Sequence, residues 1–236
     1  MRLEIINRDL LKALAGINSI ANKRNIQGAP SRVKISIIKN RLHLYATDLE
    51  IFIEKNVKIQ ATADVTTVVP IGSFYEIIRG LGEDTKITLL FENIHENGAK
   101  MIIKTSLAEF SLPCIDSQDF PSHKEEGSFY DFSIFSEDLN FILLSTKHAI
   151  STDNARNYLN GGYLHLIQKG NETMLRVVAT DSHRLALADT LMTTKTNLMP
   201  GVILPVKCIN ELCKLLQITS GQITISVSKN MIKFII

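Results

Sequence analysis

Three neighbouring residues, Asp181, Ser182 and His183, have the side chains that hydrolases use for nucleophilic catalysis. In such a site the serine attacks, the histidine takes its proton, and the aspartate orients the histidine, so the three groups must converge. Consecutive residues at a strand end point in different directions, and this geometry strongly disfavours the hydrolase alternative. The sequence instead predicts a turn in which Asp181 and Ser182 bind backbone groups.

Other signals of chemistry are missing from the sequence. It has no P-loop, no G-x-G-x-x-G, no nucleophile elbow and no H-E-x-x-H zinc motif. Cys208 and Cys213 have a spacing on one predicted helix that does not suit a metal, and packed thiols are the better interpretation. We therefore expect no catalytic residues, no metal and no cofactor.

The composition is that of an ordinary globular protein, with 45% hydrophobic and 21% charged residues. Lys and Arg number 26 against 24 Asp and Glu, so no overall basic field attracts nucleic acid. The three cysteines are odd in number and form no C-x-x-C, which predicts reduced thiols in a cytoplasmic protein. No secretion signal or membrane-spanning apolar run is found, so we expect no membrane partner.

The elements that position the Asp181 turn occur twice along the chain. The sequence Ala-Thr-Asp ends an alternating segment at residues 46–48 and again at residues 179–181. Upstream of each copy lies a strand, an Asp-Leu pair and a helical apolar period, and downstream lies a strand ending in proline and a second helix. The offset between copies grows from 129 to 133 to 135 residues across aligned positions, which small loop insertions explain. The repeating unit is therefore a whole domain.

Each unit is predicted to be an α+β domain with two short helices on one face of antiparallel sheets of roughly eight strands. We expect the first domain at residues 1–122 and the second at 123–236, with a linker over 113–127. Asn7, Ser73 and Ser136 are predicted to cap the helices that follow them, and residues 151–160 are predicted to be irregular. By analogy with the first unit, one more strand is expected after Ile236.

The assembled pattern resembles the DNA polymerase III β subunit, the bacterial sliding clamp. The most specific matching stretches are RNYLNGG at 156–162 and VATDSHRLA at 178–186. Further support comes, in order along the chain, from LLKAL at 10–14, ATDLE at 46–50, TTVVP…IIRGL at 66–81, FSLP…DFP at 110–121 and VILPVK…ELCKLL at 202–216.

This resemblance implies a ring of two chains, each with three similar domains, that encircles double-stranded DNA with its helices lining the hole. The present sequence looks like the first two domains, with the second lacking its end and the third absent. Ring closure would hold the replicative polymerase on DNA, and the protein would do no chemistry of its own. The implied partners are duplex DNA without sequence preference, the polymerase III α subunit, the clamp loader, other proteins with clamp motifs and a second copy of the full-length chain.

Two groups of site residues follow from the resemblance. The implied DNA contacts are Arg24, Arg79, Arg156, Tyr158 and Lys207; without the resemblance, solvated surface charge would be the ordinary interpretation of the basic ones. The implied pocket for partner peptides is lined by Leu159, Thr180, Ser182, His183, Arg184 and Leu185.

An apolar slot with a polar rim suits an extended peptide with leucine or aromatic anchors. Leu159 and Leu185 would otherwise be interpreted as plain core. Ser182 departs from the glycine that the family commonly has before His-Arg, which bears on the shape of the turn. Because the other pocket wall would come from a third domain, we expect weak peptide binding by this chain. The alternative function is a shortened clamp that acts as a peptide-binding decoy or regulator without forming a ring.

Overall fold

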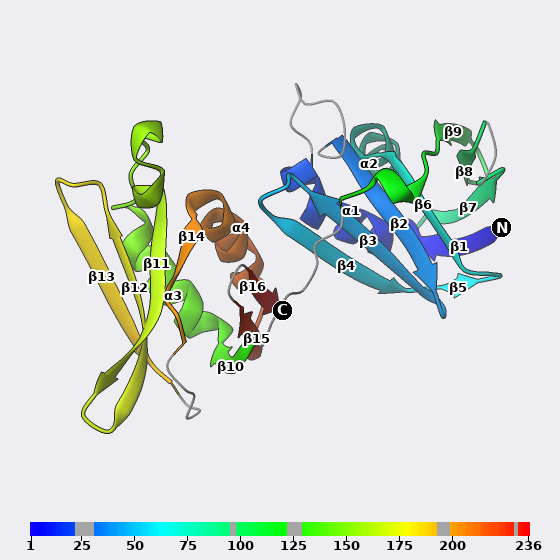
Figure 1. The fold of residues 1–236 in the computed structure, drawn as a ribbon. Helices are drawn as coiled ribbons and strands as arrows, with labels where there is room; N and C mark the ends of the chain where they lie inside the picture. The colour runs from blue at the N-terminus through cyan, green and yellow to red at the C-terminus, as the bar shows by residue number, and fades with distance from the viewer. Residues whose placement is uncertain (22–30, 95–97, 122–128, 193–198, 229–230) are drawn as a thin grey trace. The chain divides into compact units, whose positions relative to one another are not determined.

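The computed structural model describes residues 1–21, 31–94, 98–121, 129–192, 199–228 and 231–236. The chain forms two compact units, Met1–His123 and Lys124–Ile236, each built from two α-helices and antiparallel sheets (Figure 1).

Among its described residues, the first unit contains nine strands and two helices. Its strands are β1 (Arg2–Ile6), β2 (Arg32–Ile38), β3 (Arg41–Thr47), β4 (Phe52–Lys58), β5 (Gln60–Ala61), β6 (Val65–Pro70), β7 (Lys86–Glu92), β8 (Lys100–Lys104) and β9 (Glu109–Pro113). Its helices are α1 (Asn7–Ala21) and α2 (Ile71–Gly80), followed by the 3-10 turn η2 (Ser117–Asp119). The strands form two antiparallel sheets, in the orders β5-β1-β7-β8-β9 and β4-β3-β2-β6.

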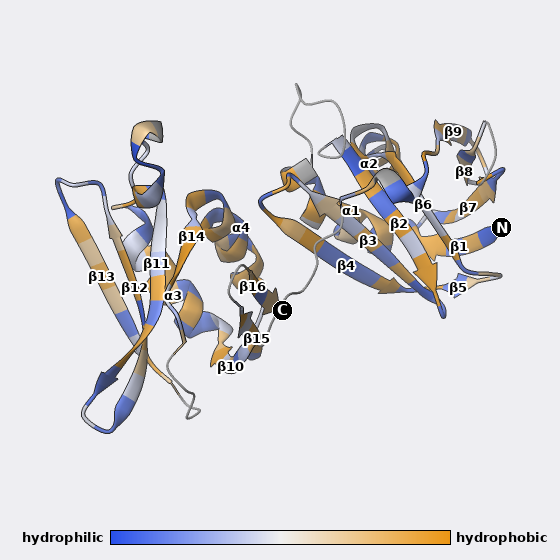
Figure 2. Ribbon diagram, in the orientation of Figure 1, coloured by the Kyte–Doolittle hydropathy of each residue, from blue (hydrophilic) through white to orange (hydrophobic). Residues whose placement is uncertain are grey.

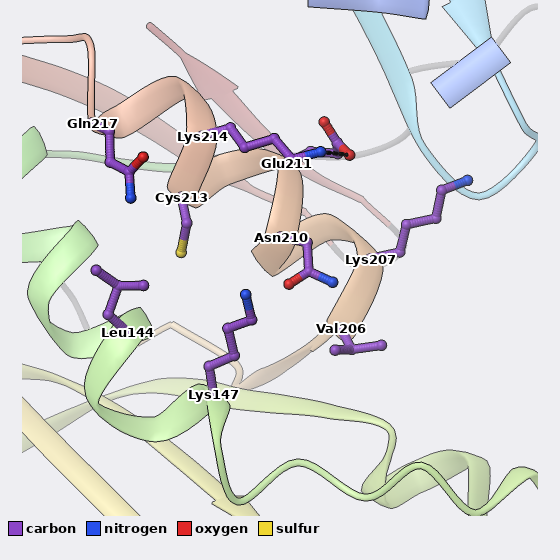
Figure 3. Close-up of a pocket in the computed structure, with 9 residues that line it drawn as sticks. All are labelled: Leu144, Lys147, Val206, Lys207, Asn210, Glu211, Cys213, Lys214 and Gln217. Carbon is purple, nitrogen blue, oxygen red and sulfur yellow. Dashed lines mark hydrogen bonds and ion pairs between the residues drawn. The ribbon is translucent and has the colours of Figure 1, made fainter. Parts of the chain in front are cut away.

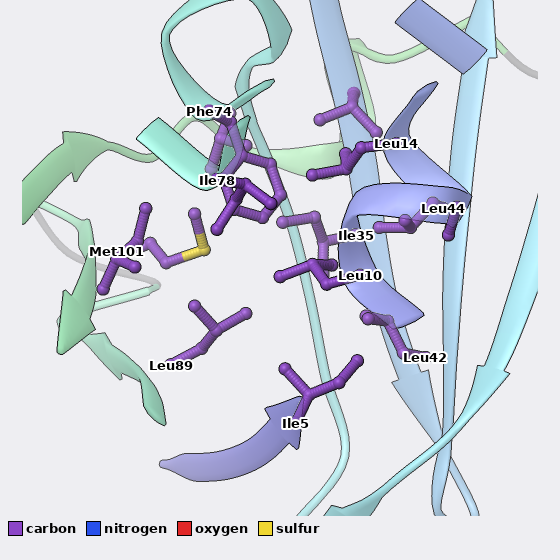
Figure 4. Packing of buried hydrophobic residues seen from close by; sticks show 14 of the residues in the cluster. Ile5, Leu10, Leu14, Ile35, Leu42, Leu44, Phe74, Ile78, Leu89 and Met101 are labelled. Carbon is purple, nitrogen blue, oxygen red and sulfur yellow. The ribbon is translucent and has the colours of Figure 1, made fainter. Parts of the chain in front are cut away.

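The core of the first unit lies where the helix pair meets both sheets. Helix α1 packs on α2, on β3 and β4 of one sheet and on β1 of the other. Figure 4 shows the side chains that meet there, all of them buried: Ile5, Leu10, Leu14, Ile35, Leu42, Leu44, Phe74, Ile78, Leu89 and Met101. The apolar stripe of α1 and the alternation of the strands therefore face one core, as the periodicity predicts.

The second unit repeats this plan. Its elements are β10 (Tyr130–Phe135), α3 (Ser136–Lys147), the 3-10 segment η3 (Asn154–Leu159), β11 (Gly161–Lys169), β12 (Glu172–Thr180), β13 (Leu185–Leu191), β14 (Val202–Pro205), α4 (Val206–Leu216), β15 (Gln222–Val227) and β16 (Ile232–Ile235). The sheet orders are β10-β15-β16 and β13-β12-β11-β14, all antiparallel. The second order matches β4-β3-β2-β6 of the first unit, strand for strand.

The second unit has its own hydrophobic core. Leu139, Ile142 and Leu143 of α3 are buried, and so are Ile209 and Leu212 of α4. Hydropathy bands along the strands of both units show the same alternation of apolar and polar positions (Figure 2). Residues 154–159, predicted to be irregular, form η3 instead, because Asp153 accepts a hydrogen bond from the backbone N–H of Ala155 and starts a tight turn.

The three predicted helix caps are wrong, and for two of them the reason is shared. Asn7 is fully buried, and its side-chain amide donates to the carbonyls of Ile78, Leu81 and Gly82 at distances of 3.2, 2.9 and 3.0 Å. The last carbonyls of a helix have no partners within the helix, and Asn7 supplies a hydrogen-bond donor at this end of α2. Ser136 does the equivalent in the second unit, where its hydroxyl donates to the carbonyl of Thr219 at 3.0 Å.

The third predicted cap, Ser73, is the third residue of α2. Pro70 occupies the cap position of that helix, and Pro205 occupies it in α4. Neither cap position makes a side-chain cap hydrogen bond. A fixed φ near −60° lets proline leave a strand and enter a helix directly, so the chain needs no polar cap there.

Candidate peptide site and nucleic-acid surface

The second Ala-Thr-Asp sequence closes the hairpin between β12 and β13, where Thr180 pairs with Leu185. One oxygen of the Asp181 carboxylate accepts from the backbone N–H groups of His183 and Arg184, both at 3.0 Å. The Thr180 hydroxyl donates to the carbonyl of Arg184 at 2.7 Å. These local bonds fix the turn that carries most of the predicted pocket residues.

The Asp181 carboxylate is fully engaged in this turn. Its second oxygen accepts from Nε of Arg184 at 2.9 Å. The two backbone N–H groups, with smaller help from the Arg184 guanidinium, hold the pKa of Asp181 below its ordinary value. The Asp181 carboxylate and the Ser182 hydroxyl form hydrogen bonds with groups other than the His183 ring, so the structure does not assemble a hydrolase triad here.

The first Ala-Thr-Asp sequence makes the same turn between β3 and β4. Asp48 accepts from the backbone N–H groups of Glu50 at 3.2 Å and Ile51 at 2.8 Å. The residue after each aspartate has a left-handed backbone, with φ of +78° at Leu49 and +77° at Ser182. This conformation favours glycine and disfavours other residues. The repeat read from three residues is therefore a repeat of backbone geometry.

A long-range contact adds a second segment to the turn. Nη1 of Arg156, in η3, donates to the Ser182 hydroxyl at 2.8 Å, and Nε of Arg156 lies 3.8 Å from the Asp153 carboxylate. Arg156 interrupts η3 with φ −121° and ψ 60°, so the segment is two short turns separated by a kink. The structure thus brings Arg156, predicted as a DNA contact, to the turn that carries the predicted peptide residues.

The two leucines of the predicted pocket are not core residues. The side chain of Leu185 is 66% exposed, Leu159 is half-buried, and Tyr158 beside it is 68% exposed. Thr180 is half-buried, and Ser182, His183 and Arg184 are exposed. Exposed apolar side chains next to polar turn residues suit the rim of a protein-binding site.

The outward face of the same sheet carries apolar residues that the sequence prediction missed. Leu187 and Leu191 lie two and six residues after Leu185 on β13, with exposed fractions near one half. Tyr163 and Ile203 pair across β11 and β14 on this face and are similarly exposed. The signal was present in the sequence. In LALADTL the three leucines fall on one face of the strand, and the two alanines fall on the other.

The predicted DNA contacts are spread over separate elements. Arg24 lies outside the described residues. Arg79 is exposed in the last turn of α2, where it pairs with Glu76 and lies over the ring of Tyr75. Lys207 is half-buried in the first turn of α4.

A hollow of about 410 Å³ between α3 and α4 adds two basic residues that the sequence prediction missed. Lys147 extends from the end of α3 toward Cys213, whereas Lys207 points away from the hollow (Figure 3). Lys214 is paired with Glu211 at 2.8 Å. The lining is completed by Leu144, Val206, Asn210 and Gln217.

The helices carry little net charge. Across α1 to α4 there are six basic and five acidic side chains. Arg79, Lys147 and Lys214 each lie in the last turn of their helix, where the helix dipole by itself favours a cation. The basic side chains of these four helices are therefore scattered, and acidic side chains nearly balance them.

Comparison with known proteins decides the family. Residues 1–124 match the family described as "DNA polymerase III beta subunit, N-terminal domain". Residues 134–236 match the family described as "DNA polymerase III beta subunit, central domain". The chain belongs to the DNA polymerase III β-subunit family.

Similar proteins of this β-subunit family come from several bacteria. The beta sliding clamp of Caulobacter vibrioides is 34% identical over 99% of this chain and 62% of its own length. That of Pseudomonas aeruginosa is 29% identical over 99% of this chain and 61% of its own. The chain thus spans about 60% of the length of these relatives.

Solved β-subunit structures share the fold. A crystal structure of the C. crescentus beta sliding clamp, with polyethylene glycol bound to its putative beta-motif tethering region, has a TM-score of 0.92 at 33% identity. A Bartonella birtlesii sliding clamp bound to griselimycin has a TM-score of 0.88 at 30% identity. Both cover 99% of this chain, which covers 61% and 62% of theirs. The predicted α+β clamp fold is confirmed.

Two features are absent from the described residues. None of the described helices combines the length and apolarity needed to cross a membrane. No cluster of three or more His, Cys, Asp or Glu side chains suited to a metal was found in the same part of the chain. Cys114, Cys208 and Cys213 are free thiols, and burial raises the pKa of Cys208 to about 11.

Proposed function

We propose that this protein is a sliding clamp, which encircles duplex DNA as a homodimeric ring and tethers the replicative polymerase and other replication and repair proteins. The observation that carries the proposal is the match of two consecutive units, over 99% of the chain, to clamps of known structure. The proposed setting is the bacterial cytoplasm, and the proposed role is non-catalytic. The shortened decoy remains the alternative, and no contact among the described residues favours it.

The near-balance of charge on the helices is consistent with retention by topology. A protein that holds DNA by many phosphate contacts loses affinity steeply with salt, whereas a closed ring needs only weak contacts. The proposed DNA contacts are the five residues that the family resemblance implies, joined by Lys147 at the hollow between α3 and α4: Arg24, Arg79, Arg156, Tyr158 and Lys207. Such contacts position DNA without reading its sequence.

The proposed partner site lies at the β12–β13 turn. Leu185 and Leu159 supply apolar surface for a leucine or aromatic anchor, and Thr180, His183 and Arg184 supply polar groups at the rim. The proposed ligands are short segments of the polymerase III α subunit, the clamp loader and other proteins with clamp motifs.

Retention on DNA tests the ring. The native protein is loaded on nicked circular duplex by its clamp loader, and bound protein is separated by gel filtration before and after the circle is linearised. We expect retention on the circle at high salt and release on linearisation. Equal loss from circles and linear DNA would contradict the proposal.

The phosphate contacts are tested by salt dependence on a short linear duplex. Lys147→Gln should make the negative slope of log K against log salt shallower by about 0.9, if Lys147 neutralises one phosphate. Lys169→Gln is the matched control, since Lys169 is an exposed lysine at the end of β11 on the same unit. An equal change in both variants would show a general charge effect instead.

A further inference from the structure

The contact between Arg156 and Ser182 joins two segments that are 26 residues apart. Segment η3 carries Tyr158 and Leu159, and the β12–β13 turn carries His183 and Leu185. These are the two halves of the proposed peptide site. The 2.8 Å hydrogen bond from Arg156 to Ser182 connects these two halves.

The Ser182 side chain is held where a serine is unfavourable. A φ of +77° crowds the Cβ of any residue other than glycine, and asparagine is the side chain that tolerates it best. The backbone N–H of Ser182 donates to the Thr180 hydroxyl at 3.2 Å. The Ser182 hydroxyl makes a separate bond, in which it accepts from Arg156. The equivalent residue of the first unit, Leu49, has the same φ and no hydroxyl. The turn therefore forms without this bond, and the bond has a separate consequence.

Arg156 is prepared for this contact by its own surroundings. The kink at Arg156 breaks η3 into two turns, and Asp153 lies on the Nε side of the guanidinium while Ser182 lies at Nη1. A planar guanidinium with fixed donors loses little further freedom when two of its sides are already directed. A prearranged site binds a flexible ligand more tightly, because less ordering is needed on binding.

We propose that Ser182 is a positioning residue of the peptide site: its hydroxyl holds Arg156, and this latch fixes η3 against the β12–β13 turn so that Leu159 and Leu185 present one surface to an extended peptide. This inference rests on the proposed function, because it concerns the same partner site. It assigns to Ser182 and Arg156 a joint role in peptide affinity that is separate from the stability of the turn.

Substitutions in the native protein separate affinity from stability. Binding of a fluorescein-labelled peptide, QAALF, is measured by fluorescence anisotropy, and thermal unfolding is measured in parallel. Ser182→Gly should weaken binding by about two- to tenfold, the worth of one hydrogen bond. The same variant should unfold at an equal or higher temperature, since glycine relieves the strain at φ +77°. A purely structural role would move affinity and stability in the same direction.

Rescue and a double-mutant cycle identify the latch. Ser182→Asn keeps an acceptor oxygen at a φ that asparagine tolerates, and should retain most of the affinity. Arg156→Ala should weaken binding as much as Ser182→Gly, and the double variant should be no weaker than either. Leu49→Gly relaxes the matching turn of the first unit and should leave peptide affinity unchanged.

The outcomes distinguish the latch from the site itself. Undiminished binding by Ser182→Gly, or additive losses in the double variant, would overturn the latch while the peptide site stands. If the unsubstituted protein binds no peptide at millimolar concentration, the proposed peptide site is wrong and the latch role is overturned with it.

Discussion

Leu49 and Ser182 have the same backbone conformation, with φ of +78° and +77°, each one residue after the aspartate of an Ala-Thr-Asp sequence. In both turns that aspartate accepts hydrogen bonds from the backbone N–H groups of the residues two and three positions later. The two units therefore share a side-chain-stabilised turn in addition to their strand order. The copy in the second unit differs by its hydroxyl and by the arginine that reaches it.

Acid should loosen the turn of the second unit. Backbone N–H groups and Arg184 favour the charged form of Asp181 and lower its pKa. A carboxylate with a depressed pKa contributes fully above the unfolded value of about 4, and this contribution is lost as the pH falls through the lower folded value. The backbone amide signals of His183 and Arg184, followed by NMR from pH 7 to pH 2, should titrate below pH 4.

The matched variant for this titration is Asp181→Asn, which keeps an acceptor oxygen and removes the charge. It should abolish the pH dependence of the two amide signals. A titration midpoint at or above pH 4 in the unsubstituted protein would contradict the assigned role of Asp181.

Removing the buried amide of Asn7 should destabilise the first unit. Asn7→Ala removes a donor from all three carbonyls at the end of α2. Those of Ile78 and Gly82 keep backbone donors in Leu81 and Thr85, so the carbonyl of Leu81 is the one left without a described donor, and one buried unsatisfied group costs about 1–3 kcal/mol. We expect a loss of about 2 kcal/mol in the free energy of unfolding, measured by urea denaturation followed by circular dichroism. Ser136→Ala removes the single equivalent bond in the second unit and should cost less. Equal losses would argue against the three-carbonyl role.

Two glycines of similar appearance in the sequence should respond in opposite ways to alanine. A Cβ at Gly161 would lie 2.3 Å from the backbone oxygen of Leu204, so the paired strands β11 and β14 must separate. Gly161→Ala should cost about 1–3 kcal/mol, the usual range for overpacking. A Cβ at Gly80 meets nothing within 4 Å, and Gly80→Ala should stabilise the protein by about 0.5 kcal/mol. Thermal unfolding of the two variants checks both signs.

The thiol of Cys208 should react slowly. Burial raises its pKa to about 11, with a smaller contribution from Glu211, so roughly one thiol in a thousand is ionised at pH 8. Labelling of the native protein by iodoacetamide, quantified by peptide mass spectrometry, should rise about tenfold per pH unit up to pH 10. Labelling in urea, where burial is lost, is the control. A plateau below pH 9 in the native protein would contradict the raised pKa.

Much of the fold could be predicted because its signals are local. Alternation of apolar residues identified most strands, and the stripes of α1, α3 and α4 identified their buried faces. The Ala-Thr-Asp turns were also predictable, since an aspartate and the backbone groups that it binds lie within three residues of one another. The helix caps failed for the opposite reason: Asn7 and Ser136 resemble caps in sequence, but their partners lie more than 70 residues away.

The sequence by itself determined the repeat, the α+β class, the family resemblance and the residues of the β12–β13 turn. Only the tertiary structure decided that Asn7 closes α2, that Lys147 faces α4 across a hollow, and that Arg156 holds Ser182. Local patterns are set by bonds within one turn or strand. Contacts between distant segments depend on how the helices pack on the sheets, and no spacing in a single sequence records that packing.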